Sequence, residues 1–261
     1  MNILGQDNIL NLIDSLNIGN FPQTLMLIGP KGAGKKSIIN YITSKFNIES
    51  SELNTSTIDD IYLQVNPHFY IVDINNITPK EQESLLKLVE EPPKNIFIIF
   101  TVDNVVNVLN TIINRCIIWT LNKYTEAQLK SFISNSNYDP YMLEIASTPG
   151  DILEMQDYNF NDIKELANKI LLKMSKATLP NALSISSKLA FNDEKDKFNI
   201  RLFMLTLMNE NLKIIKNSRD SIYYSTYNII NKYSNKQSFN KLNQKYLIEN
   251  MIIDLWELNK A

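Results

Sequence analysis

The chain has too few of several residue types to belong to some classes of protein. It has one cysteine, Cys116, and one histidine in 261 residues, which excludes a disulfide framework and gives too few ligands for a zinc site. Its apolar runs are a handful of residues long, whereas about 18 are needed to cross a bilayer. The N-terminus also lacks the basic segment of a signal peptide. We therefore expect a soluble, cytoplasmic protein with no membrane partner and no zinc.

The charge is nearly balanced but unevenly distributed. The net charge is −2, with an acidic excess in residues 1–160 and a basic excess in residues 161–261. Complementary subunit contacts, a polyanion near the C-terminal part and ordinary solvated helix faces are all compatible with this division. Charge alone leaves these interpretations open.

Glycine and proline are scarce and concentrated early in the chain. The chain has six glycines and nine prolines, and residues 181–261 contain neither, which predicts packed helices there. The first 120 residues instead alternate short apolar runs with helical patterns such as Glu81–Glu91, which stops at Pro92-Pro93. We expect an α/β domain with a parallel sheet in residues 1–121. The predicted strands are Thr24–Ile28, Phe69–Val72, Ile96–Phe100 and Ile117–Trp119.

Half of the glycines lie in one segment between a predicted strand and a predicted helix. The segment fits the pattern G-x-x-x-x-G-K, in which backbone N–H groups surround phosphates and a lysine reaches the outer ones. This context predicts a nucleotide-binding P-loop. The residues expected to contact the nucleotide are Gly29, Pro30, Lys31, Gly32, Ala33, Gly34, Lys35, Lys36 and Ser37.

Two positions that support hydrolysis in such proteins are changed. The hydroxyl that binds Mg²⁺ normally follows the lysine of the loop, but Lys36 stands there and the hydroxyl of Ser37 comes one residue late. Asp73 ends a predicted strand at the usual magnesium position, but Ile74 follows it and cannot act as a base. We predict binding of ATP or ADP without efficient hydrolysis. Magnesium binding stays open, and no metal ligands are assigned.

The segment Leu85–Pro93 resembles the L-L-K-x-L-E-E-P-P motif of DNA polymerase clamp-loader subunits, which are AAA+ proteins. Gly5-Gln6, Phe21–Leu25, Asn66–Phe69 and Asn114-Arg115-Cys116 are similar to further motifs in the family's order. The match covers about residues 3–155. Ser147–Ile152 is similar in position to the sensor-2 helix of the family but lacks its usual arginine. This variant resembles the delta-prime subunit of bacterial DNA polymerase III, although the four-cysteine zinc module of that type is absent, which leaves a bacterial or phage origin open.

The resemblance implies three domains and a role for single residues. It implies an AAA+ domain in residues 1–121, a small helical lid domain in 122–160 and an all-α collar for oligomerisation in 161–261. Thr101 would occupy the sensor-1 position beside the nucleotide. Arg115 would act as a finger on the nucleotide of a neighbouring subunit. The alternative for Arg115 is a local salt bridge.

By this resemblance the chain is an ATPase-deficient structural subunit of a sliding-clamp loader in DNA replication. Its implied partners are other loader subunits in a hetero-oligomer, a pentamer in this family, the sliding clamp, and primer-template DNA contacted through the complex. It would then work in the cytoplasm at the replisome. Two alternatives remain open at this stage, namely an ATP-hydrolysing motor subunit of the loader and an AAA+ adaptor of the helicase-loader type.

Overall fold

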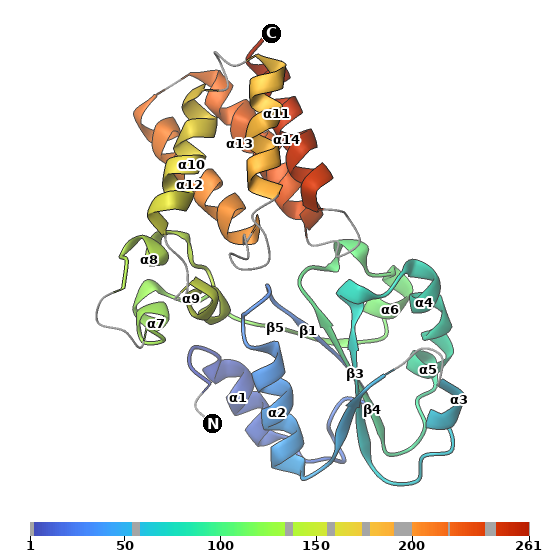
Figure 1. Ribbon diagram of the computed structural model, residues 1–261. Coiled ribbons are helices and arrows are strands. Elements are labelled where there is room, and N and C mark those ends of the chain that lie inside the picture. The colour runs from blue at the N-terminus through green and yellow to red at the C-terminus, as the bar shows by residue number, and fades with distance from the viewer. Residues whose placement is uncertain are drawn as a thin grey trace. The chain divides into compact units, whose positions relative to one another are not determined.

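The computed structural model describes residues 3–53, 58–133, 138–155, 160–173, 178–190, 200–218, 220–237 and 244–260 (Figure 1). The chain forms two compact units. Unit 1 comprises Met1–Ser136 and Ala146–Leu153, and unit 2 comprises Asn137–Ile145 and Glu154–Ala261. Residues 122–160, which the sequence assigns to one lid domain, are thus divided between the two units.

Unit 1 is built on a five-stranded sheet in which every neighbouring pair is parallel. The strand order is β2-β3-β4-β1-β5, and it confirms the predicted α/β class with a parallel sheet. The four predicted strands are present, whereas β2 was not predicted. The strands are β1 (Thr24–Ile28), β2 (Ser50–Glu52), β3 (His68–Asp73), β4 (Ile96–Val102) and β5 (Ile117–Thr120).

Helices cover both faces of this sheet (Figure 1). Leu25 and Leu27 of β1 pack with Ile38 and Ile42 in one apolar cluster, while Met26, between them, packs with Leu88 in another. This alternation is the two-residue period of a strand, and burial on both faces explains why β1 and β4 consist almost entirely of apolar residues. The helices are α1 (Asp7–Ser15), α2 (Lys35–Phe46), α3 (Ile58–Ile61), α4 (Pro79–Ser84), α5 (Leu86–Glu90) and α6 (Asn110–Ile113).

The helix predicted over Glu81–Glu91 is wrong as one continuous element. Thr78 begins α4 with a capping box to Glu81, and α4 ends at Ser84 before α5 begins at Leu86. At Leu85 the backbone N–H bonds the carbonyl of Gln82, three residues back. This tight turn interrupts the i→i−4 hydrogen bonds.

The regular secondary structure in the described part of unit 2 consists of helices. Its core gathers apolar side chains from α10, α11, α12, α13 and α14, among them Ile170, Phe203, Ile230 and Met251. The helices predicted from the lack of glycine and proline after residue 180 are confirmed. The remaining helices of the chain are α7 (Glu126–Lys130), α8 (Tyr141–Ile145), α9 (Pro149–Met155), α10 (Phe160–Lys173), α11 (Leu179–Ala190), α12 (Ile200–Asn217), α13 (Ser221–Gln237) and α14 (Gln244–Leu258).

In the part of the chain that the structure describes, no helix is long and apolar enough to cross a membrane.

Candidate functional site

The glycine-rich loop joins the end of β1 to the start of α2, as the sequence predicts. Gly32 has φ of 81° and Gly34, which caps α2, has φ of 96°. These are left-handed conformations that glycine adopts without a steric penalty. The backbone N–H of Gly29 bonds the carbonyl of Val102 at 3.1 Å, which fixes the start of the loop beside the end of β4.

Lys35, the lysine assigned to phosphate, points back onto its own loop. Its Nζ donates to the carbonyl of Gly29, to the carbonyl of Pro30 at 3.3 Å and to Oδ1 of Asp103 at 2.6 Å. The side chain is only 13% exposed, and that of Asp103 is 28% exposed. Lys35 therefore forms a partly buried ion pair with a carboxylate at the end of the neighbouring strand.

Asp73, the residue at the usual magnesium position, accepts hydrogen bonds from the turn that follows β3. Oδ1 of Asp73 accepts from the backbone and side-chain nitrogens of Asn75 at 3.2 and 2.7 Å, and Oδ2 accepts from Nδ2 of Asn76 at 2.8 Å. Ile74 is 2% exposed. Both carboxylate oxygens of Asp73 thus accept hydrogen bonds within this turn, and Lys36 stands where a hydroxyl would bind Mg²⁺.

The other residues predicted to contact the chain's own nucleotide lie at the same end of the sheet. Thr101 is buried and pairs in register with Asp73. Lys31 and Lys36 are exposed, Ser37 is half-buried and Ala33 is buried. The carboxyl ends of β1, β3 and β4 thus bring the loop together with Asp73 and Thr101, at the edge of an open α/β sheet where ligands bind in such folds.

The start of α9, where the resemblance places sensor 2, packs directly on the loop. Oγ1 of Thr148 donates to the carbonyl of Lys31, and the N–H of Gly150 donates to the carbonyl of Gly32, both at 3.1 Å. A Cβ on Gly150 would overlap the Cα of Gly32. Only glycine at both positions permits this approach of the two backbones.

The N-terminal Gly-Gln motif is joined to the segment after β5. The side-chain amide of Gln6, fully buried, donates to and accepts from the backbone of Asn122 at 3.1 and 2.8 Å. Next to it the hydroxyl of Tyr124 donates to the carbonyl of Ala33 at 2.9 Å. Burial raises the pKa of Tyr124, so the phenol stays protonated and remains a donor.

Arg115 lies at the opposite end of the sheet from the loop. It precedes β5, and its carbonyl accepts from Oγ1 of Thr24, the first residue of β1, at 2.6 Å. At roughly 3.3 Å per residue, the five positions from Thr24 to Gly29 span about 16 Å. Arg115 is therefore poorly placed to act on the loop of its own chain.

The guanidinium of Arg115 makes the local salt bridge that the sequence leaves as its alternative. Nη2 lies 2.6 Å from Oε1 of Glu90, and Nη1 donates to the carbonyl of Thr111 at 2.8 Å. The side chains of Arg115 and Glu90 are 38% and 48% exposed. Exposed pairs of this kind are worth about 0–1 kcal/mol, so the guanidinium can leave Glu90 at little cost.

Cys116 and His68 show no sign of reactive chemistry. Burial raises the pKa of the Cys116 thiol to about 12, which keeps it from being a thiolate. His68 is the first residue of β3, and its Nε2 is 2.9 Å from Oγ of Ser51. Within the described ranges, no group of three or more His, Cys, Asp or Glu residues could hold a metal ion.

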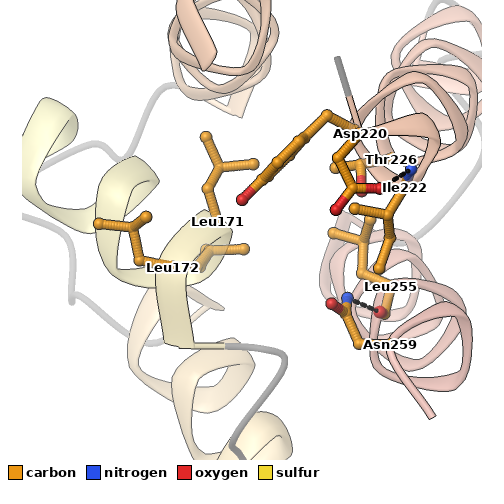
Figure 2. A pocket seen from close by; sticks show the side chains of 9 residues that line it. Leu171, Leu172, Asp220, Ile222, Thr226, Leu255 and Asn259 are labelled. Atoms are coloured by element: carbon orange, nitrogen blue, oxygen red, sulfur yellow. Dashed lines mark hydrogen bonds between the residues drawn. The ribbon is translucent and has the colours of Figure 1, made fainter. Parts of the chain in front are cut away.

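Unit 2 contains a cavity of about 200 Å³ between α10, the start of α13 and α14 (Figure 2). Figure 2 shows Leu171 and Leu172 of α10 across the cavity from Asp220 and Thr226. Asp220 accepts from the backbone N–H of Ile222 at 3.1 Å and so begins α13. None of the predicted site residues lines this cavity.

Sequence reasoning missed three residues that shape the site: Asp103, Tyr124 and Gly150. An acid placed directly after a buried strand was a usable signal for Asp103, because the carboxyl ends of parallel strands meet at one edge. The approach of Gly150 to Gly32 and of Tyr124 to Ala33 depends on the path of the chain after β5. No local pattern carries that information.

Comparisons with known proteins find similarity to subunits of DNA polymerase III. Residues 63–125 match the family model described as DNA polymerase III, delta subunit. DNA polymerase III subunit gamma of Buchnera aphidicola subsp. Schizaphis graminum is 22% identical in an alignment that covers 87% of this chain and 73% of that protein.

Among solved structures, a point mutant of RuvB from Thermotoga maritima is 13% identical, with a TM-score of 0.50 over 96% of this chain and 89% of that one. A gamma subunit-related protein of Thermotoga maritima is 14% identical, with a TM-score of 0.47 over 98% and 99%. The RuvB likeness shows a shared fold. The family model and the gamma subunit support the clamp-loader resemblance, and neither singles out the delta-prime type.

Proposed function

We propose that this chain is a structural subunit of a sliding-clamp loader that hydrolyses ATP poorly itself and supplies Arg115 to the nucleotide of a neighbouring subunit. The observation that carries the proposal is the position of Arg115. It lies at the end of the sheet remote from its own loop, half-exposed and held by a weak salt bridge to Glu90. The segment that matches the delta-subunit family model, residues 63–125, contains both of these residues.

The chain's own loop supports the ATPase-deficient part of the proposal. Lys36 stands at the hydroxyl position, the Asp73 carboxylate is used by a turn, and the buried Ile74 offers no base. We propose that ATP or ADP binds here through the loop amides and Lys35 and turns over slowly if at all, because metal activation of the phosphates lacks its ligands.

Unit 2 supports assembly with other subunits. It exposes large apolar side chains on several helices, namely Leu172, Leu212, Tyr224 and Tyr246, a feature of protein-binding surfaces. We propose that residues 161–261 act as the collar of a hetero-oligomer, and that the sliding clamp and primer-template DNA are reached through that complex. Mass spectrometry of proteins that co-purify with the tagged chain tests these partners, and recovery of a helicase instead of polymerase subunits would favour the adaptor alternative.

The test of the Arg115 role is ATP hydrolysis by the reconstituted loader at saturating ATP. Arg115→Ala should reduce turnover at the affected site by up to about 10³-fold, the effect of a lost arginine finger. Subunit stoichiometry should stay unchanged. Arg115→Lys should not restore the activity fully, because an ammonium lacks the planar fork of a guanidinium. Full activity of Arg115→Ala in a complete complex would return Arg115 to a local structural role.

The gamma-subunit relative favours one alternative, an ATP-hydrolysing motor subunit. Steady-state hydrolysis by the isolated chain separates the two. The structural subunit should show no turnover above background, and Lys35→Ala should not change that result. Robust turnover that Lys35→Ala abolishes would support the motor subunit.

A further inference from the structure

Acceptors from the same chain already occupy the donors of Lys35, the lysine of the phosphate loop. An ammonium has three N–H donors, and those of Lys35 have three acceptors close by: the carbonyls of Gly29 and Pro30 and the carboxylate of Asp103. In this arrangement no donor of Lys35 is left for a phosphate oxygen. A polyphosphate must displace at least the Asp103 carboxylate to reach it.

Asp103 is held in place by its backbone. Its N–H donates to Oδ1 of Asn75 at 3.2 Å, and the residue before it, Val102, bonds the N–H of Gly29. The backbone of Asp103 is therefore fixed between the end of β3 and the loop, which holds its carboxylate near the Lys35 ammonium. With Lys35 only 13% exposed, solvent screens this pair less than a surface pair.

We propose that Asp103 is an internal competitor for phosphate, so that the loop binds a nucleotide only when the Lys35–Asp103 ion pair opens. The proposal deepens the proposed function and rests on the part of it that gives the loop a polyphosphate ligand. The paired form is the resting state, and the apparent affinity of the ligand is reduced by the fraction of molecules in which Lys35 is free. The carboxylate also repels the phosphate charge directly.

The experiment is calorimetric titration of the full-length protein with ATP, ADP and pyrophosphate in EDTA, so that no metal contributes. Asp103→Asn and Asp103→Ala should each bind about 5- to 10-fold more tightly than the unmodified protein, from the loss of competition and repulsion. Asp103→Ala is included because an asparagine could still accept from Lys35. Lys35→Met should abolish binding both in the protein with Asp103 and in the variants that replace it.

Glu126→Gln is the matched control, since it removes one negative charge from an exposed side chain of unit 1 that is not a partner of Lys35. It should change the affinity by less than about twofold, as expected for a screened surface charge. An equal gain for Glu126→Gln would show a general charge effect and overturn the competitor role.

Unchanged or weaker binding by both Asp103 variants would also overturn the proposal. So would the absence of binding by every variant, because the loop would then have no phosphate to exclude. None of these outcomes decides the role of Arg115, which acts on another chain and is tested by hydrolysis in the complex. Binding without a gain in the Asp103 variants would therefore fail only the competitor role, whereas no binding by any variant would also remove the nucleotide ligand of the loop from the proposed function.

Discussion

Lys35 and Arg115 are cations that the sequence assigns to the phosphates of two different nucleotides, and they lie at opposite ends of one parallel sheet. Lys35 is 13% exposed, with Asp103 and two carbonyls around its ammonium, and the start of α9 packs on the adjacent loop. Arg115 is 38% exposed and has one half-exposed carboxylate and one carbonyl. One end of the sheet is closed by contacts within the chain, and the other presents its cation outward.

The two cations differ in how readily they can leave their present partners to bind a phosphate. A cation whose donors are satisfied in a partly buried setting must be released before it can bind a ligand. A cation in an exposed pair exchanges partners with little loss. This difference supports the proposal that Arg115 acts on the nucleotide of a neighbouring subunit.

The largest loss of stability is expected from Gly150→Ala, at the end of the sheet that carries the phosphate loop. The new Cβ would overlap Gly32, so one backbone must shift, and overpacking of this kind costs about 1–3 kcal/mol. The free energy of unfolding in urea measures it. Gly19→Ala is the control, because its Cβ would closely approach only the end of the Asn17 side chain. Equal values for the two variants would mean that the loop and α9 are not packed as described.

Two single substitutions, one at each cation, compare the two ion pairs directly. Lys35→Met should lower the free energy of unfolding by about 1 kcal/mol, because it leaves the partly buried Asp103 without its partner. Arg115→Met should lower it by less than about 0.5 kcal/mol, since its pair is half-exposed. Urea unfolding of both variants under the same conditions is the measurement. A larger loss of unfolding free energy for Arg115→Met than for Lys35→Met would contradict this expectation.

The smallest effect is expected from Glu90→Gln. The guanidinium of Arg115 keeps the carbonyl of Thr111 and loses only an exposed ionic contact. Stability should change by less than about 0.5 kcal/mol, and hydrolysis by the complex should stay within about twofold. A tenfold fall in hydrolysis with normal assembly would instead make Glu90 a residue that positions Arg115.

The sequence predicts the part of the fold that local patterns determine. Apolar runs located β1, β3, β4 and β5. For β1 and β4 the reason is burial on both faces, whereas β5 is apolar although Ile117 and Ile118 are exposed. The strand β2, Ser50–Glu52, was missed because it is a short, exposed edge strand of polar residues. The break at Leu85 was missed as well, since the residues on either side of it are ordinary helix formers.

The site was predictable in its chemistry and less so in its contacts. The glycine spacing identified the loop, and the substitutions at Lys36 and Ile74 indicated weak hydrolysis, a prediction that awaits measurement. The Lys35–Asp103 pair and the contact of Gly150 with Gly32 join residues that are distant in the chain. Such contacts depend on strand order and on the path of α9, which no residue pattern specifies.

The central position of β1 has a consequence for folding during synthesis. Leu25 pairs with Ile99 on one side and with Ile117 on the other. The strand β1 is therefore synthesised first and cannot complete its pairing until β4 and β5 have both been made. At about 5–20 residues per second, ribosomes need several seconds to produce them. Until then the apolar β1 has two unpaired edges, a template for association with other chains. Chaperone binding to nascent chains should therefore be strongest after β1 has emerged and should fall once β5 has left the ribosome.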